Sequence, residues 1–223
     1  MTIPTSFYHD FRLLGLDLPQ APGIFAQNQK AKEPIILGYL MFAIGKLKAR
    51  GITPLTFTEL FCADAYYAFF ARNFGADRAY GFDNNRDGYL DQAFRVQEII
   101  GDEGVELHQL DIFDIPKDFR SSIVANIGGL YHTADPLRAL EFSYEMCRNY
   151  LIVQSVVTLA TEDEDYFETP APGWAWGCRF SYAWLRRQII QLGYRIIDTE
   201  RNQLPGNGRP EDCGSAYFLI SKS

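Results

Sequence analysis

The chain has 223 residues, 47% of them hydrophobic, and a formal net charge of -7. This length fits a single domain with at most a short extra segment, and the hydrophobic content is enough to bury a core, which excludes a disordered chain. The negative charge and the lack of a continuous basic run argue against a nucleic-acid-binding protein. The densest charge cluster, residues 162–165, is acidic, and we expect it to be a solvated loop.

Cysteine spacing and apolar runs indicate the compartment. The cysteines form no CxxC pair, and no histidine or cysteine lies at zinc-ligand spacing from another, so we expect free thiols and no metal site. Residues 1–10 lack the basic-then-apolar pattern of a secretion signal. The longest nearly apolar run, residues 35–45, is far shorter than the roughly 20 residues that cross a bilayer. We therefore expect a soluble cytoplasmic protein with no membrane partner.

The N-terminal part differs from the rest of the chain. Residues 6–32 are rich in aromatic residues, Gly and Pro without a sustained period, and we expect an irregular cap or lid. Residues 33–50 carry apolar side chains at helical spacing, with Pro34 suited to the first turn, which predicts a helix. We accordingly divide the chain into a cap with a lid helix, residues 1–50, and a main domain, residues 51–223.

Predicted strands and helices alternate along the main domain. Alternation of this kind indicates parallel strands with crossover helices, because a hairpin cannot join a parallel pair. The last two strands are joined by a loop with two prolines and three glycines, which favours an antiparallel hairpin at the sheet edge. We expect strands over residues 55–62, 78–83, 105–110, 121–127, 150–157, 195–200 and 216–220, and helices over residues 65–74, 87–100, 136–148 and 181–192.

Acidic residues end two successive predicted strands, where ligands of open α/β sheets bind. The carboxylate of Asp83 can accept two hydrogen bonds from a ribose diol; the alternative is that it caps the following turn. Asp111 can accept from an adenine amine while Ile112 covers the ring; the alternative is an aspartate that merely begins a loop.

The turn after the first strand contains no glycine. A dinucleotide fold requires G-x-G-x-x-G there, so a pyrophosphate-binding NAD enzyme is disfavoured. A cofactor that presents only a carboxylate and an amine makes a smaller demand. Ala63 and Ala65 are small enough for its close approach provided that their φ angles are negative, and the N-terminus of the next helix favours the carboxylate.

Residues 56–76 resemble motif I of the class I S-adenosylmethionine-dependent methyltransferases, which usually reads acid-x-G-x-G-x-G. Glu59 keeps the acidic position, whereas Phe61, Ala63 and Ala65 stand where glycines are expected. Asp83 matches the ribose-binding acid of that family, and the Asp-Ile-Phe-Asp sequence from Asp111 resembles its adenine-contacting motif.

A narrower resemblance concerns residues 126–136, which contain Leu-Tyr-His-Thr-Ala-Asp-Pro. They resemble the segment after the fourth strand in tRNA wobble-uridine carboxymethyl transferase-like proteins. Residues 7–9 with 21–23, and residues 180–182, also resemble that branch.

The resemblance implies a Rossmann-like methyltransferase fold. This is a three-layer α/β sandwich with a seven-stranded, mostly parallel sheet and an antiparallel C-terminal hairpin. It also implies S-adenosylmethionine as the cofactor and transfer of its methyl group. The cofactor-binding residues expected on this basis are Glu59, Phe61, Cys62, Ala63, Asp83, Asn84, Asp111, Ile112, Asn126 and Gly128.

A hydroxyl acceptor needs a base, for which His132 is the first candidate, with Tyr131 beside it. The alternative is that His132 only satisfies backbone groups in its turn, and His9 on the cap is a second candidate. Several aromatic residues can wall an acceptor pocket or simply pack in the core. They are Tyr8, Phe25, Tyr131, Phe167, Trp174, Trp176 and Phe180.

Three functions remain open. The leading hypothesis is methyl transfer to an oxygen or nitrogen of a small-molecule acceptor. The second is a tRNA-modifying enzyme, which the branch resemblance and scattered arginines suggest and the net charge disfavours. The third is a non-catalytic binding subunit, which the missing glycines suggest. A small molecule is the expected partner, nucleic acid is not expected, and a homo-oligomer is left open.

Overall fold

The computed structural model describes residues 5–171 and 177–222 of the chain. Seven strands form the main sheet, and β6 and β7 form a separate two-stranded ribbon. The elements are η1 (Phe11–Leu14), α1 (Ile24–Ala49), β1 (Thr56–Leu60), α2 (Tyr66–Asn73), β2 (Arg78–Asp83), α3 (Leu90–Ile100), β3 (Val105–Gln109), η2 (Ile112–Asp114), β4 (Ser121–Ile127), η3 (Leu130–His132), α4 (Pro136–Met146), β5 (Cys147–Val157), β6 (Phe167–Glu168), β7 (Arg179–Phe180), α5 (Tyr182–Gln191), β8 (Arg195–Gln203), η4 (Pro210–Asp212) and β9 (Gly214–Ser221).

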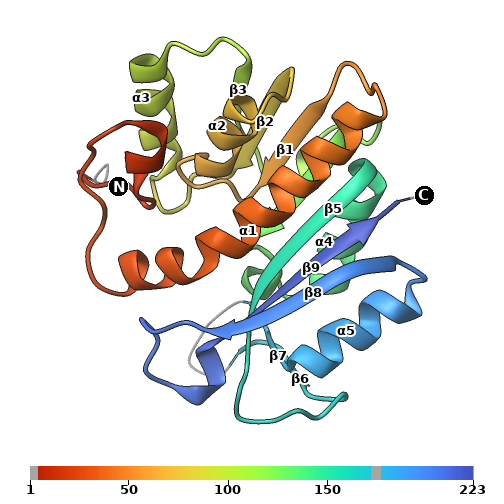
Figure 1. Ribbon diagram of the computed structural model, residues 1–223. Helices are drawn as coiled ribbons and strands as arrows, with labels where there is room; N and C mark the ends of the chain where they lie inside the picture. Colours follow the sequence, from red (N-terminus) through yellow and green to blue (C-terminus); the bar gives the residue numbers. More distant parts are fainter. Residues whose placement is uncertain (1–4, 172–176, 223) are drawn as a thin grey trace.

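The main sheet has the strand order β3-β2-β1-β4-β5-β9-β8 (Figure 1). Strands β1 to β5 pair in parallel, and β9 is antiparallel to both β5 and β8. This confirms the predicted fold class, including the antiparallel C-terminal hairpin. The strand order reverses between β1 and β4, and that reversal opens a crevice at the carboxyl ends of the strands.

Two apolar cores lie on opposite faces of this sheet. One contains side chains of α1, α2 and α3, and the other contains those of α4 and α5. Along β4, Ile123 and Ala125 belong to the first core and Val124 to the second. This alternation follows from the two-residue period of a strand, and burial on both faces explains why these strands are nearly continuous apolar runs.

Helix α1 begins at Ile24, well before the predicted start at residue 33. Pro34 therefore lies inside the helix and not in its first turn, and Figure 1 shows the first turns at an angle to the rest, as expected for an internal proline. Gln29 and Lys32 are buried at the same spacing as the apolar residues after them. The buried stripe of α1 is continuous from Gln29 onward, but its first residues are polar. Hydrophobic periodicity therefore did not identify the first turns as helix.

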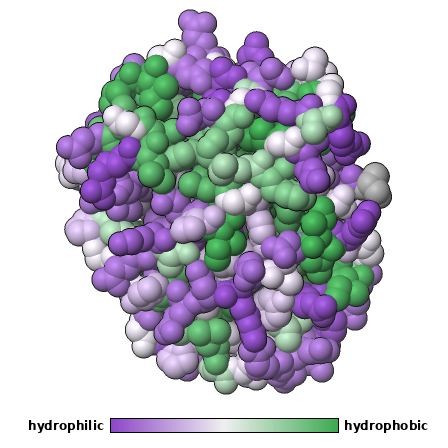
Figure 2. Space-filling view, viewed as in Figure 1, coloured by the Kyte–Doolittle hydropathy of each residue, from purple (hydrophilic) through white to green (hydrophobic). Residues whose placement is uncertain are grey.

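The face of the molecule that carries α1 mixes apolar and polar side chains (Figure 2). Met41 and Phe42 of this helix are among the exposed large hydrophobic residues, whereas Leu40 and Ile44 are buried against the sheet. Across residues 5–171 and 177–222, no helix combines the length and the apolar character needed to span a membrane.

Candidate functional site

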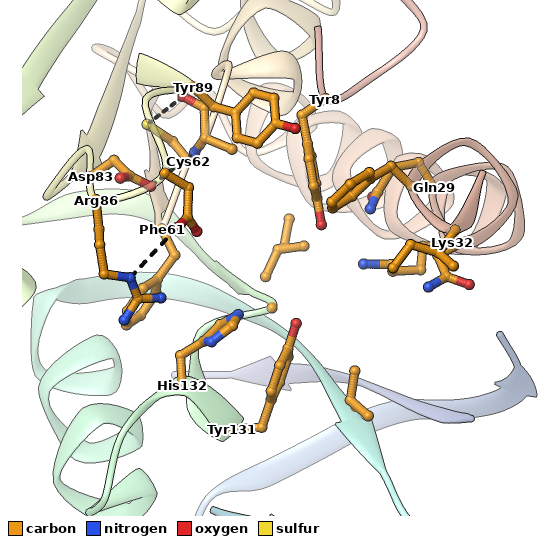
Figure 3. A pocket seen from close by; sticks show the side chains of 18 of the residues that line it. Tyr8, Gln29, Lys32, Phe61, Cys62, Asp83, Arg86, Tyr89, Tyr131 and His132 are labelled. Carbon is orange, nitrogen blue, oxygen red and sulfur yellow. Dashed lines mark hydrogen bonds and ion pairs between the residues drawn. The ribbon is translucent and has the colours of Figure 1, made fainter. Parts of the chain in front are cut away.

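A cavity of about 1000 Å³ lies in the crevice beyond the carboxyl ends of the central strands (Figure 3). We call its two parts the strand end and the helix end. The strand end is lined by residues that end or follow β1, β2, β3 and β4, namely Phe61, Cys62, Ala63, Asp83, Asn84, Asp111, Ile112 and Gly128. The helix end is lined by Tyr8, His9, Phe25, Gln29, Lys32, Tyr131 and His132.

The turn after β1 has the backbone of a glycine-rich loop without its glycines. Phe61, Ala63 and Ala65 have φ angles of 56°, 48° and 57°. The condition set for close approach at the two alanines, a negative φ, is therefore not met. The backbone N–H of Cys62 donates to the carbonyl of Phe82 at 3.1 Å, and that of Ala65 donates to the carbonyl of Cys62 at 2.7 Å. These bonds hold alternate residues in the left-handed region, which costs a residue with a Cβ roughly 1–2 kcal/mol.

The ring of Phe61 does not fill the cavity. It lies directly over Gly129, where an added Cβ would come within 2.0 Å of the ring atom Cδ2. The ring also contacts the core on the α4 face of the sheet. An aromatic residue is thus accommodated at this turn because Gly129 offers no side chain.

Glu59 is 2% exposed and lines the cavity, but its Oε2 accepts from the backbone N–H of Ala68 at 2.8 Å. The same N–H also donates to the carbonyl of Ala65 at 3.1 Å, so Glu59 adds a second, shorter hydrogen bond in the first turn of α2. Burial, which the hydrogen bond only partly offsets, raises the pKa of Glu59 well above its usual range. Glu59 therefore fastens α2 to β1.

Asp83 joins the two turns that border the strand end. Its Oδ2 accepts from Ala63 N–H at 3.0 Å, and its Oδ1 accepts from Asn85 N–H at 2.7 Å. Burial raises the pKa of this carboxyl, and the two backbone donors oppose that rise. The N–H of Leu90 at the start of α3 is bound by Asn85 and not by Asp83. Each oxygen of Asp83 has a further lone pair for a ligand.

Asp111 lines the same cavity as Asp83 and also accepts from Phe113 N–H at 3.1 Å, which begins η2. Ile112 beside it is buried, and Gly128 lines the cavity with a φ of 73°. Asn126 is the exception among the predicted residues. Its Nδ2 donates to Ser143 of α4 at 2.9 Å, so this side chain lies on the helix-covered face of the sheet and does not line the cavity.

Tyr8, Lys32, Tyr131 and His132 point toward one space at the helix end (Figure 3). Burial lowers the pKa of Lys32 to about 8. Burial and the charge of Arg86 lower the pKa of His132 to about 4, so its imidazole is neutral at physiological pH. Burial also raises the pKa of both tyrosines, that of Tyr131 to about 12. The predicted candidates Tyr131 and His132 therefore lie together in the cavity.

His9 also lines the cavity, and its ring is fixed from two sides. Asp64 lies 2.6 Å from Nδ1, and the ring stacks on Tyr66 with centroids 4.7 Å apart. Gln29, Lys32 and Asp64 were not predicted as site residues. For Gln29 and Lys32 the signal in the sequence is that polar residues stand on the buried stripe of α1, which requires knowing where that helix begins.

Of the other aromatic candidates, Tyr8 and Phe25 line the cavity. Phe167 and Phe180 instead stack on Trp184 in the α5 core, with centroids 4.8 Å and 5.1 Å from its ring. The predicted candidates Trp174 and Trp176 lie outside the described residues.

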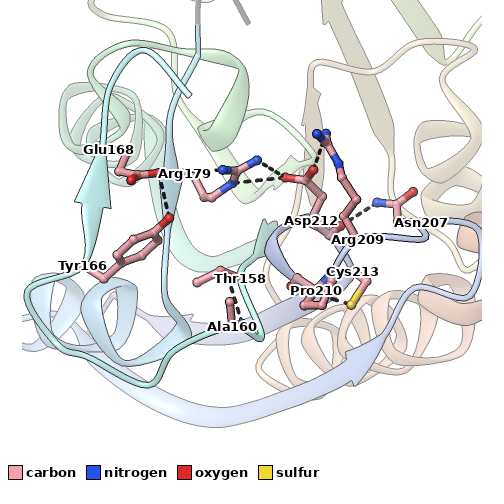
Figure 4. A network of polar contacts seen from close by, with 10 residues as sticks. All are labelled: Thr158, Ala160, Tyr166, Glu168, Arg179, Asn207, Arg209, Pro210, Asp212 and Cys213. Carbon is pink, nitrogen blue, oxygen red and sulfur yellow. Dashed lines mark hydrogen bonds and ion pairs between the residues drawn. The ribbon is translucent and has the colours of Figure 1, made fainter. Parts of the chain in front are cut away.

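The loop between β8 and β9 closes the cavity over the start of α1. Gly206 N–H donates to the side chain of Asn28 at 2.9 Å, and Asn28 in turn donates to Asn207. Asp212 holds the other side of the loop through Arg179 at 2.8 Å and Arg209 at 2.6 Å (Figure 4). This Pro- and Gly-rich loop, predicted only as a hairpin connection, is thus part of the site.

No protein-family model matches the sequence, and no curated protein matches it either. Solved structures do match. Magnesium protoporphyrin IX methyltransferase from Synechocystis with bound SAH superposes with a TM-score of 0.63 at 15% identity, over 96% of this chain and 93% of that one. The N-terminal domain of EvdMO1 with SAH bound gives 0.59 at 14% identity, over 83% and 81%. The 4+2 cyclase SpnF gives 0.59 at 15% identity, over 75% and 74%.

At these identities the similarity establishes the fold. The chain has the Rossmann-like fold of class I S-adenosylmethionine-dependent methyltransferases. The narrower resemblance to tRNA wobble-uridine carboxymethyl transferase-like proteins stays a prediction.

Proposed function

We propose that this protein binds S-adenosylmethionine in the cavity and transfers its methyl group to an oxygen or nitrogen of a small-molecule acceptor. The observation that carries the proposal is that Asp83 and Asp111, from neighbouring strands, line one cavity at the point where the strand order reverses. Ligands of open α/β sheets bind at that point.

The strand end fits an adenosine moiety. Asp83 accepts from the ribose hydroxyls, which donate, and its backbone contacts to Ala63 and Asn85 hold the carboxylate in place. Asp111 accepts from the adenine amine, and the apolar side chain of Ile112 covers the base. Gly128 leaves room on the opposite wall.

When bound, the cofactor supplies a methyl group already activated on a sulfonium, so the protein has to position the acceptor and exclude water. The helix end suits this task because α1 and the β8–β9 loop cover it. His132, neutral and half-buried, accepts a hydrogen bond from the acceptor and orients it, with Tyr131 beside it. A base whose pKa is about 4 orients an alcohol better than it deprotonates one.

A small acceptor fits the site better than RNA. The cavity is bordered by α1 and the β8–β9 loop, and the protein carries a net charge of -7, which repels a phosphate backbone. The solved neighbours that have the same fold include a porphyrin methyltransferase, which supports a small acceptor.

Isothermal calorimetry with S-adenosylmethionine and S-adenosylhomocysteine tests the cofactor assignment. Saturable one-to-one binding of both is expected.

A gel shift with bulk tRNA at low salt separates the two acceptor classes, because the small-molecule proposal expects no shift and a tRNA-modifying enzyme requires one. Incubation with methyl-labelled S-adenosylmethionine and a cell extract tests the third hypothesis. An enzyme transfers the label to small molecules of the extract, and a binding subunit without activity does not.

A further inference from the structure

Lys32 is a charged residue in an unusual place. It lies on the cavity side of α1, is 4% exposed, and continues the stripe of buried residues that runs along the helix. Burying an ammonium is costly unless a partner of opposite charge is present, and lysine is rarely this buried without one.

None of the described residues supplies that partner. No carboxylate of residues 5–171 or 177–222 forms an ion pair with the Lys32 amine. The acids that line the cavity are each bound to other groups, namely Glu59 to Ala68, Asp83 to Ala63 and Asn85, Asp87 to Arg86, Asp111 to Phe113, and Asp212 to Arg179 and Arg209.

The surroundings of Lys32 are rich in donors. The hydroxyls of Tyr8 and Tyr131 point into the same space from opposite sides, and burial raises the pKa of both, so they remain protonated donors (Figure 3). The pKa of Lys32 falls to about 8, and its amine therefore still carries a proton at neutral pH. An ammonium between two phenol hydroxyls is a set of groups that recognises an anion.

We propose that the acceptor carries an anionic group, a carboxylate or a phosphate, and that Lys32 binds it at the helix end with help from Tyr8 and Tyr131. The inference rests on the proposed function, since it concerns the acceptor side of the same cavity. The aromatic side chains of Tyr8, Phe25 and Tyr131 around this position also suit an acceptor with a ring.

The methionine carboxylate of the cofactor is the competing anion. In the proposed orientation the adenosine lies at the strand end, beside Asp83 and Asp111, whereas Lys32 lies across the cavity on α1 (Figure 3). Which anion Lys32 binds is decided by comparing ligands with and without the amino-acid moiety.

The first experiment titrates benzoate, phenyl phosphate and the neutral isostere benzamide into the protein by calorimetry, with and without saturating S-adenosylhomocysteine. The variants are Lys32→Met, which keeps the length of the stem, and Lys30→Met, an exposed lysine of the same helix. At least one anion is expected to bind at least about tenfold more tightly than benzamide. Lys32→Met is expected to remove that preference, and Lys30→Met to leave it unchanged.

Equal binding of benzamide and the anions overturns the proposal, as does an unchanged preference in Lys32→Met. The anion that binds with the higher affinity, benzoate or phenyl phosphate, shows whether the site prefers a carboxylate or a phosphate. Thermal unfolding of Lys32→Met, expected at or above the wild-type temperature, verifies that loss of binding is not loss of fold.

The second experiment compares S-adenosylhomocysteine with 5′-methylthioadenosine, which lacks the amino-acid moiety. Lys32→Met is expected to bind both as the wild type does. A loss confined to S-adenosylhomocysteine assigns Lys32 to the cofactor and overturns the inference. Failure of the wild type to bind S-adenosylhomocysteine defeats the proposed function instead, and the anion titrations of the free protein still decide the Lys32 site.

Discussion

Asp64 binds His9 at two points. Its Oδ1 lies 2.6 Å from the ring atom Nδ1, and its Oδ2 accepts from the backbone N–H of the same histidine at 2.8 Å. Asp64 belongs to the turn after β1, and His9 belongs to the N-terminal segment. The segment that walls one side of the cavity is thus fixed to the turn that borders the other.

Asp64→Asn is expected to lower the free energy of unfolding by about 2 kcal/mol. The two carboxylate oxygens of Asp64 meet the backbone N–H and the ring Nδ1 of His9, whereas an asparagine amide has only one oxygen that can accept. Denaturant unfolding measures the change, and limited proteolysis is expected to cut the N-terminal segment faster. Asp10→Asn is the control, since Asp10 pairs with an Arg12 side chain that is 73% exposed. An Asp64→Asn protein as stable as the control contradicts the role given to Asp64.

Ala63→Gly and Ala65→Gly are each expected to stabilise the protein by about 1 kcal/mol. Both alanines have positive φ angles, where a Cβ is unfavourable and glycine is not. Ala71→Gly, inside α2, is the matched control and is expected to destabilise by about 1 kcal/mol, as glycine does within a helix. Thermal and denaturant unfolding give the signs, and the same sign for all three variants contradicts the backbone assignment.

Lys32→Met is expected to stabilise the protein by up to about 3 kcal/mol at neutral pH, where the buried amine is charged. The folded pKa of about 8 lies below the usual 10.5, so above pH 8 the unfolded state binds more protons than the folded state. The wild type should therefore gain stability as pH rises from about 8 to 10.5, and Lys32→Met should lack that gain. Urea midpoints across this range measure it, and parallel curves for the two proteins contradict it.

His132 should contribute acid sensitivity. Its folded pKa of about 4 lies below the usual 6.5, so the unfolded state takes up the proton first as pH falls. Stability is expected to fall between pH 6.5 and 4, and less steeply in His132→Gln. His108→Gln serves as the control histidine. NMR titration of the imidazoles gives the pKa directly, and a His132 that titrates near 6.5 contradicts the burial argument.

The order of the elements followed from the sequence because apolar runs and helical periods alternate, and β2 and β4 have the predicted bounds. The acids at the ends of β2 and β3 were found for a related reason. Parallel neighbours bring their carboxyl ends to one edge of the sheet. The position of Asp83 and Asp111 at one cavity could therefore be predicted without knowing how the side chains pack.

The errors have physical causes. Asn126 stands one residue before Ile127, and because a strand alternates, that single step puts its side chain on the α4 face. The negative φ that was set as a condition at Ala63 is the usual preference of alanine, and the hydrogen bond to Asp83 and those around the turn override that preference. Lys32 was missed because the predicted helix began at residue 33, so Lys32 was assigned to the irregular segment, whereas α1 begins at Ile24.

Titration of S-adenosylhomocysteine into the wild type, Asp83→Asn and Asp114→Asn by calorimetry tests the central claim most directly. Asp114 is an exposed acid that does not line the cavity, so its variant is the matched control. One-to-one binding is predicted, with affinity at least about tenfold weaker in Asp83→Asn and unchanged in Asp114→Asn. No binding by the wild type at about 1 mM ligand, or equal affinities for all three folded proteins, would contradict it.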